Sequence, residues 1–215
     1  MEKEALKRIF DFLEGKGEHK MPVRWKLINN QPLTKEELIV DDDLDLSYTS
    51  ITSLPEELKV GGSLLLSGCK NITSLPEGLK VGGDLFLSRL KITSLPEGLK
   101  VGGLLALVNT NITSLPEGLK VGRGIYLDGS PITSLPEGLK VVGNLDLSRT
   151  KITSLPKGLK VEGNLTLYQT KITSLPEGLK VGDNIYIGNT KLKNLTDDEL
   201  IKMIKPGFIK GKIVR

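Results

Sequence analysis

The chain has 215 residues and a formal net charge of +4 at pH 7, from 30 basic and 26 acidic residues. This weak surplus, interleaved with acidic groups, does not require a nucleic-acid partner, and we expect none. The single cysteine and the single histidine exclude an internal disulfide and metal sites built on pairs of these residues, so we expect no metal and no cofactor.

The N-terminal segment is predicted to form an amphipathic helix over residues 2–14. Its apolar residues follow the i, i+3, i+4, i+7 spacing of one helix face: Leu6, Ile9, Phe10 and Leu13. The charged start MEKEALKRIF lacks the apolar run of a signal peptide. No stretch of about 18 apolar residues, the length that a membrane helix needs, is present. We therefore expect a cytoplasmic protein without a membrane partner.

The next segment connects this helix to the rest of the chain. PVRWKLI, at residues 22–28, is interpreted as a short extended segment. Thr34 and Glu37 have the spacing of a capping box, which favours a helical turn at residues 35–39. We interpret residues 1–40 as an N-terminal helical cap that covers the end of the structure that follows.

An internal repeat organises the rest of the chain. The decapeptide ITSLPEGLKV at residues 72–81 recurs, with small changes, from Ile51, Ile92, Ile112, Ile132, Ile152 and Ile172. The copies are 21 residues apart once and 20 residues apart thereafter, and the copy at Ile51 carries Glu57 in place of the glycine. Self-similarity at such a period is typical of a solenoid, in which each unit buries its apolar side against its neighbours.

Each unit also contains a short Leu-x-Leu pattern, from Leu44 and Leu46 in the first unit to Ile185 and Ile187 in the last. Alternation predicts a strand, and one strand per unit requires a parallel sheet with a crossover in every turn. The crossover rule predicts a right-handed path. The prolines of the SLPEG segments exclude a helix there, so we expect an extended return on the opposite side.

The pattern Leu-x-Leu-x-x-(Thr/Ser/Cys)-x-Ile-x-x-Leu-Pro resembles the leucine-rich repeat in its shortest form, of about 20 residues, as in bacterial effectors. The chain also looks like leucine-rich-repeat proteins encoded by phages. The resemblance covers roughly residues 40–195. It implies an α/β solenoid with a parallel sheet of about eight strands, an extended convex side and helical caps at both ends. It also implies a host cytoplasm as the location if the protein is a phage or effector product.

Two departures from this family pattern are clear. The usual asparagine, which hydrogen-bonds the backbone of adjacent turns, is mostly threonine here. The first leucine of the pattern is replaced by residues such as Gly82, Val142 or Glu162, which leaves the curvature undetermined.

The C-terminal segment is predicted to cap the other end. Thr196 and Glu199 form a second capping box, and a short apolar pattern predicts a helix that Pro206 and Gly207 end. The chain thus divides into an N-terminal cap at 1–40, a solenoid at 41–195 and a C-terminal cap at 196–215.

Function is sought in the positions that differ between units, because the repeated residues explain only the fold. The outward positions of the strands vary in chemistry, and an apolar patch on the concave sheet face is expected to bind another protein. The candidate binding residues are Leu65, Phe86, Leu104, Ala106, Val108, Tyr126, Asp128, Asp146, Tyr168 and Tyr186. Neutral drift after duplication is the alternative origin of this variation.

A lysine column is the other regular feature, comprising Lys59, Lys80, Lys100, Lys120, Lys140, Lys160 and Lys180. A column of glutamates lies three residues before it, interrupted by Lys157. We expect the two columns to form a solvated face, and polyanion binding is an alternative.

Catalysis finds no support in the sequence. His19 lies in a linker rich in glycine and lysine, where solvation is expected, and Cys69 occupies a column of small residues where a buried structural thiol is expected. We predict a non-enzymatic, monomeric module that binds another protein. A structural or particle-associated spacer is the alternative.

Overall fold

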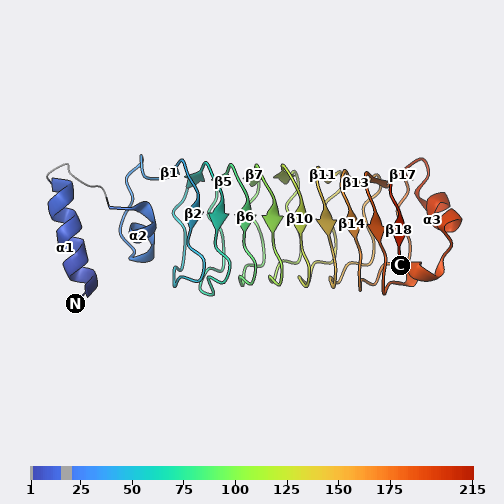
Figure 1. Cartoon of the computed structure of the whole chain (residues 1–215), viewed down its shortest axis with the longest axis horizontal. Coiled ribbons are helices and arrows are strands. Elements are labelled where there is room, and N and C mark those ends of the chain that lie inside the picture. The colour runs from blue at the N-terminus through green and yellow to red at the C-terminus, as the bar shows by residue number, and fades with distance from the viewer. Residues whose placement is uncertain (1, 16–20) are drawn as a thin grey trace.

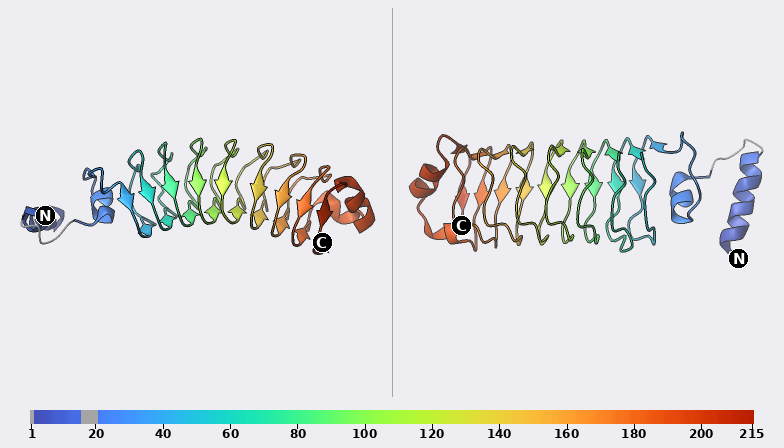
Figure 2. Two further views of the ribbon diagram at one scale, coloured as in Figure 1. Left: turned by 90° about the horizontal axis from the view of Figure 1, so that it is seen from above. Right: turned by 180° about the vertical axis from the view of Figure 1, so that it is seen from behind.

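The computed structural model describes residues 2–15 and 21–215. His19 falls outside the described residues, so its expected solvation is not addressed. The chain forms a parallel β-solenoid in which each turn repeats after about 20 residues, as the period predicted. Figure 2 shows the turns following one another along a single, shallowly bowed axis.

The eight predicted Leu-x-Leu strands and one further strand form one continuous parallel sheet of nine strands. In chain order its strands are β2 (Leu44–Asp45), β4 (Leu64–Leu65), β6 (Leu85–Phe86), β8 (Leu105–Ala106), β10 (Ile125–Tyr126), β12 (Leu145–Asp146), β14 (Leu165–Thr166), β16 (Ile185–Tyr186) and β18 (Ile213–Val214). Register follows the repeat, so that Leu105 pairs with Ile125. The last strand, β18, lies outside the repeats, and it was not predicted.

A second row of strands, also not predicted, is formed by the Lys-Val pairs in the return of each turn, with Ile39–Val40 and Phe208–Ile209 at its two ends. It divides into two sheets. One contains β1 (Ile39–Val40), β3 (Lys59–Val60), β5 (Lys80–Val81), β7 (Lys100–Val101) and β9 (Lys120–Val121). The other contains β11 (Lys140–Val141), β13 (Lys160–Val161), β15 (Lys180–Val181) and β17 (Phe208–Ile209). We call these two sheets the lysine–valine sheets.

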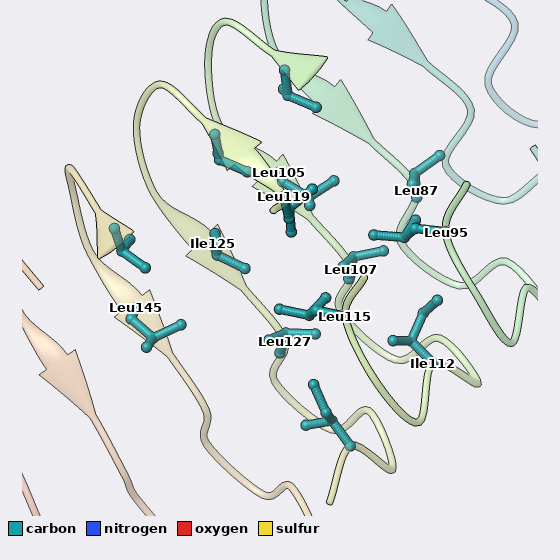
Figure 3. Packing of buried hydrophobic residues seen from close by; sticks show 14 of the residues in the cluster. Leu87, Leu95, Leu105, Leu107, Ile112, Leu115, Leu119, Ile125, Leu127 and Leu145 are labelled. Atoms are coloured by element: carbon teal, nitrogen blue, oxygen red, sulfur yellow. The ribbon is translucent and has the colours of Figure 1, made fainter. Parts of the chain in front are cut away.

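The core lies between the nine-stranded sheet and the returning segments. In one turn Leu105, Leu107, Ile112, Leu115 and Leu119 are all buried, and Figure 3 shows their side chains directed into the interior. The equivalent residues of the other turns continue this cluster along the axis. Because every turn contributes the same apolar side chains, each turn covers the core of its neighbours.

The column of small polar residues satisfies carbonyl groups inside this core. The Thr110 hydroxyl donates to the Leu107 carbonyl of its own turn at 2.9 Å, and Thr150 donates to Leu147 at 2.7 Å. Ser130 and the buried Cys69 instead reach back, each to a leucine carbonyl of the preceding turn. The threonine hydroxyls therefore bond carbonyls of their own turn.

In the part of the chain that the structure describes, helices lie only near the two ends: α1 (Glu2–Gly15), α2 (Val23–Ile28), the 3-10 helix η1 (Lys191–Asn194) and α3 (Asp197–Ile204). The capping box of α3 is present as predicted, with reciprocal bonds between Thr196 and Glu199. The interpretation of PVRWKLI as extended is wrong. This segment forms α2, in which the Pro22 carbonyl accepts the Lys26 N–H at 3.1 Å.

Two further details concern the segment before the solenoid. The predicted helical turn is present as a single turn at residues 35–38, in which the Leu38 N–H donates to the Thr34 carbonyl at 3.2 Å, and Thr34 and Glu37 make both hydrogen bonds of a capping box. Arg24 of α2 donates through Nε to the carbonyl oxygen of Asp45 at 2.7 Å, so α2 covers part of the free edge of β2. Within the described residues no helix is long and apolar enough to cross a membrane.

Candidate functional site

The central candidates lie side by side on four adjacent strands of the nine-stranded sheet. Leu65 pairs with Phe86, Phe86 with Ala106, and Ala106 with Tyr126. Adjacent strands are about 4.8 Å apart, so the four side chains form one row across the sheet. Ala106 is buried while the other three are half-buried, which places a small side chain between two aromatic ones.

Leu104 and Val108 flank Ala106 at alternate positions and therefore lie on the same face. Both are half-buried. With the row above they form what we call the apolar patch: Leu65, Phe86, Leu104, Ala106, Val108 and Tyr126. The structure thus brings these six predicted residues together on one hydrogen-bonded sheet.

The two predicted aspartates lie next to the patch, but protein groups already engage them. Asp128 forms a two-point ion pair with Arg149, in which Nε donates at 2.7 Å. The hydrogen bonds that Arg149 donates to the Asp128 carboxylate raise the pKa of Arg149 above its ordinary value. Asp146 accepts the N–H and the hydroxyl of Ser148. These carboxylates therefore have fewer oxygen lone pairs left for a partner than the sequence suggested.

The two remaining candidates lie farther along the sheet, away from the patch. Tyr168 follows β14, is 41% exposed, and accepts a hydrogen bond on its hydroxyl from Asn189 at 2.9 Å. Tyr186 is half-buried on β16. The ten predicted residues thus separate into an apolar patch over β4 to β10 and a more polar, tyrosine-containing region over β10 to β16.

A feature that sequence reasoning missed is a ladder of polar side chains directly before the strands. Each of these side chains accepts the backbone N–H of the equivalent residue in the next turn, as in Asp43 to Ser63 (2.6 Å) and Asp84 to Leu104 (2.8 Å). The members of the ladder are Asp43, Ser63, Asp84, Asn144, Asn164 and Asn184. The signal was available, since all six are short side chains with an acceptor oxygen. These positions vary in identity, yet they share one structural task.

The ladder is interrupted at Leu104 and Gly124, which have no side-chain acceptor. The Leu104 N–H donates to Asp84, but the Leu104 side chain cannot accept an N–H of the following turn. The interruption coincides with the apolar patch. At Leu104, an apolar side chain takes the place of a polar one that would accept the N–H of the equivalent residue in the next turn.

The lysine column follows the two lysine–valine sheets: Lys80 pairs with Lys100 and Lys100 with Lys120 in one, and Lys140 pairs with Lys160 and Lys160 with Lys180 in the other. Six of its seven members are exposed and Lys180 is half-buried. Among the described residues, no ammonium of this column lies within 4.0 Å of a carboxylate. The neighbouring glutamates therefore do not neutralise the lysines by direct contact.

Comparison with known proteins does not add to this geometry: no protein-family model matches the chain, and no curated protein matches it. Within the described residues, no group of three or more His, Cys, Asp or Glu side chains is arranged to hold a metal ion.

Proposed function

We propose that the chain is a leucine-rich-repeat protein of the short type, and that it binds another protein, without catalysis, through the apolar patch. The contiguous row of Leu65, Phe86, Ala106 and Tyr126 on a rigid sheet is the observation that carries this proposal. Tyrosine and phenylalanine in such rows are typical anchors of protein interfaces.

The assignment to the leucine-rich repeats draws on the strand pattern together with the internal hydroxyl bonds. Thr150 and its equivalents satisfy carbonyls beside the strand, the task that asparagine performs in that family. The likeness to bacterial effectors and phage proteins suggests a host protein as partner and the host cytoplasm as the place of action. The host protein and the host cytoplasm are inferred from this resemblance. The expectation that the partner presents an apolar surface rests on the apolar patch alone.

The energetic scale of the proposed contact is modest. Full burial of a large apolar side chain contributes about 1.5–3 kcal/mol. Phe86 and Tyr126 are already half-buried in the free protein, so each would add about 1 kcal/mol on binding. Replacing both by serine should therefore weaken binding at least about tenfold, which corresponds to about 1.4 kcal/mol.

The test is a quantitative capture experiment with the whole chain. The Phe86→Ser/Tyr126→Ser double variant is compared with wild type and with Tyr48→Ser, a control that removes an aromatic side chain 75% exposed outside the patch. We expect one partner to be retained by wild type and by the control, and lost by the double variant, with unchanged circular dichroism. Equal retention by all three proteins would refute the proposed site.

The alternative is a structural or particle-associated spacer, which would self-assemble. The two edges of the nine-stranded sheet argue against such self-assembly. Arg24 covers a carbonyl of β2 at one edge. The other edge, β18, has only two residues and is flanked by Lys212 and Arg215. Short, positively charged edges resist edge-to-edge pairing. Sedimentation should show a monomer, and concentration-dependent filaments would favour the spacer instead.

A further inference from the structure

The lysine–valine strands of successive turns pair along the stack except between β9 and β11. Elsewhere the residue after the valine donates its N–H to the valine carbonyl of the preceding turn, as in Gly122 to Val101 and Glu162 to Val141, both at 2.9 Å. No equivalent bond joins Val142 to Val121 in the described part of the chain. The second row of strands is therefore open at one turn.

The residue at this corner accounts for the opening. A Cβ placed on Gly102 or Gly122 would lie 2.0 Å from the carbonyl oxygen of the preceding corner, so at these two corners the paired turns have no room for a side chain. Val142 occupies the same corner and is 52% exposed. Glu162 also carries a side chain there and keeps its bond, so the branching of Val142 at Cβ is the distinguishing feature at the corner.

A groove of about 690 Å³ lies at this opening and extends over the neighbouring strands β5 and β7, and core leucines contribute to its lining. Its lining is mainly apolar and includes Val101, Val121, Leu119, Leu139, Pro136 and Val142. Leu119 and Leu139 are 7% and 5% exposed, whereas Leu99 and Leu159 in the paired turns are 1% exposed. Grooves of this size are typical of sites for small ligands.

The charge around the groove is positive. Lys100, Lys120 and Lys140 line it, and Glu137 is the one acidic residue in its lining. None of the three ammonium groups lies within 4.0 Å of a carboxylate among the described residues. Apolar walls beside uncompensated ammonium groups are complementary to a ligand with an apolar chain and an anionic head.

We propose that the groove between β9 and β11 binds a single-chain anionic amphiphile, with its chain against Val121 and Leu139 and its carboxylate at the lysines. The occupant is the free amphiphile in solution rather than a membrane surface, because the charge is a single row of lysines beside a narrow groove. This site lies on the lysine–valine sheets and is independent of the proposed partner-binding patch.

Titration with sodium decanoate, followed by methyl NMR of the full chain, tests the proposal. We expect saturable shifts of the Val121, Leu139 and Val142 methyl signals, and at least tenfold weaker binding by 1-decanol, which lacks the charge. Absence of these shifts would overturn the proposal, as would equal affinity for decanol. Stronger binding of anionic vesicles, or of an acidic apolar peptide, at equal concentration would overturn the choice of occupant.

The repeats supply matched controls. The triple variant Lys100→Ala/Lys120→Ala/Lys140→Ala should lose at least tenfold in decanoate affinity. Lys59→Ala/Lys160→Ala/Lys180→Ala, which removes the same charge outside this groove, should keep it. Val142→Gly should restore the β9–β11 pairing, seen as slowed exchange of the residue 142 N–H, and abolish binding. Equal losses in both triple variants, or unchanged binding by Val142→Gly with the pairing restored, would contradict the site.

Discussion

Glu57 and Gly78 occupy the same corner of successive turns, and both have a positive backbone φ, +59° and +72° respectively. The glycines of the later copies adopt the same conformation, for example Gly118 at +68°. A left-handed conformation costs a residue with a Cβ roughly 1–2 kcal/mol, whereas glycine adopts it freely. The first copy of the repeat therefore contains a strained residue that the later copies avoid.

Glu57→Gly should stabilise the protein. The relief of strain of about 1–2 kcal/mol exceeds the extra entropy that glycine loses on folding, about 0.5–1 kcal/mol. We expect a net gain of about 0.5–1 kcal/mol, measured by urea denaturation. The reverse change, Gly118→Ala, is the control, because a Cβ at Gly118 would meet no atom within 4 Å. It should destabilise by about 1 kcal/mol through φ alone, and an unchanged midpoint would contradict this account.

Asp84→Ala should weaken the polar ladder beneath the apolar patch. Asp84 Oδ1 accepts the N–H of Leu104 at 2.8 Å, and hydrogen bonds to charged groups contribute about 1.5–3 kcal/mol. Because the site is half-exposed, we expect a loss of about 1–2 kcal/mol and faster hydrogen exchange at the Leu104 N–H. Asp183→Ala, an exposed aspartate outside the ladder, should change neither quantity.

Acid should loosen α3 through its capping box. Hydrogen bonds from the backbone and the hydroxyl of Thr196 hold the pKa of Glu199 below its usual value. A carboxyl with a lowered folded-state pKa stabilises the fold above its unfolded pKa, and the contribution is lost as the pH falls through the folded value. NMR titration of Glu199 should report the lowered pKa. Thr196→Val keeps the backbone N–H but removes the hydroxyl, so it should move the pKa of Glu199 part of the way back up, and an identical titration in this variant would exclude the hydroxyl bond as a cause.

Cys69 should be unreactive until the chain unfolds. Its thiol is buried and donates to the Leu46 carbonyl at 2.9 Å, so a thiol reagent cannot reach it in the folded state. The rate of modification should rise with urea in step with unfolding. Rapid modification in native buffer would show that the turn around Cys69 opens locally, contrary to its complete burial.

Much of the fold follows from the repeat, because copying fixes the register. Once Leu105 and Leu107 are placed inward, the residues 20 positions on must take the same places, and the first eight strands of the nine-stranded sheet result. The Lys-Val strands were missed because two residues are too short to show alternation. PVRWKLI was misread because a short apolar run does not distinguish a strand from a buried helix.

The candidate site was predictable only in part. Alternation places Phe86, Ala106 and Tyr126 on one outward face, so the apolar patch could be assembled from the sequence. The polar ladder could not, because a bond from Asp84 to the following turn depends on how two turns stack. The opening at Val142 depends in the same way on a distance between backbones, which one unit of sequence does not contain.

The constant 20-residue register between β6 and β16 means that this protein can change in size by whole turns. Deleting residues 92–111 would join Lys91 to Ile112 and present the same interior to both neighbours. Removing 19 residues instead would shift every later side chain by one place and turn the leucines toward solvent. Evolution or an engineer could therefore lengthen or shorten the molecule in fixed steps, leaving both terminal helical segments untouched.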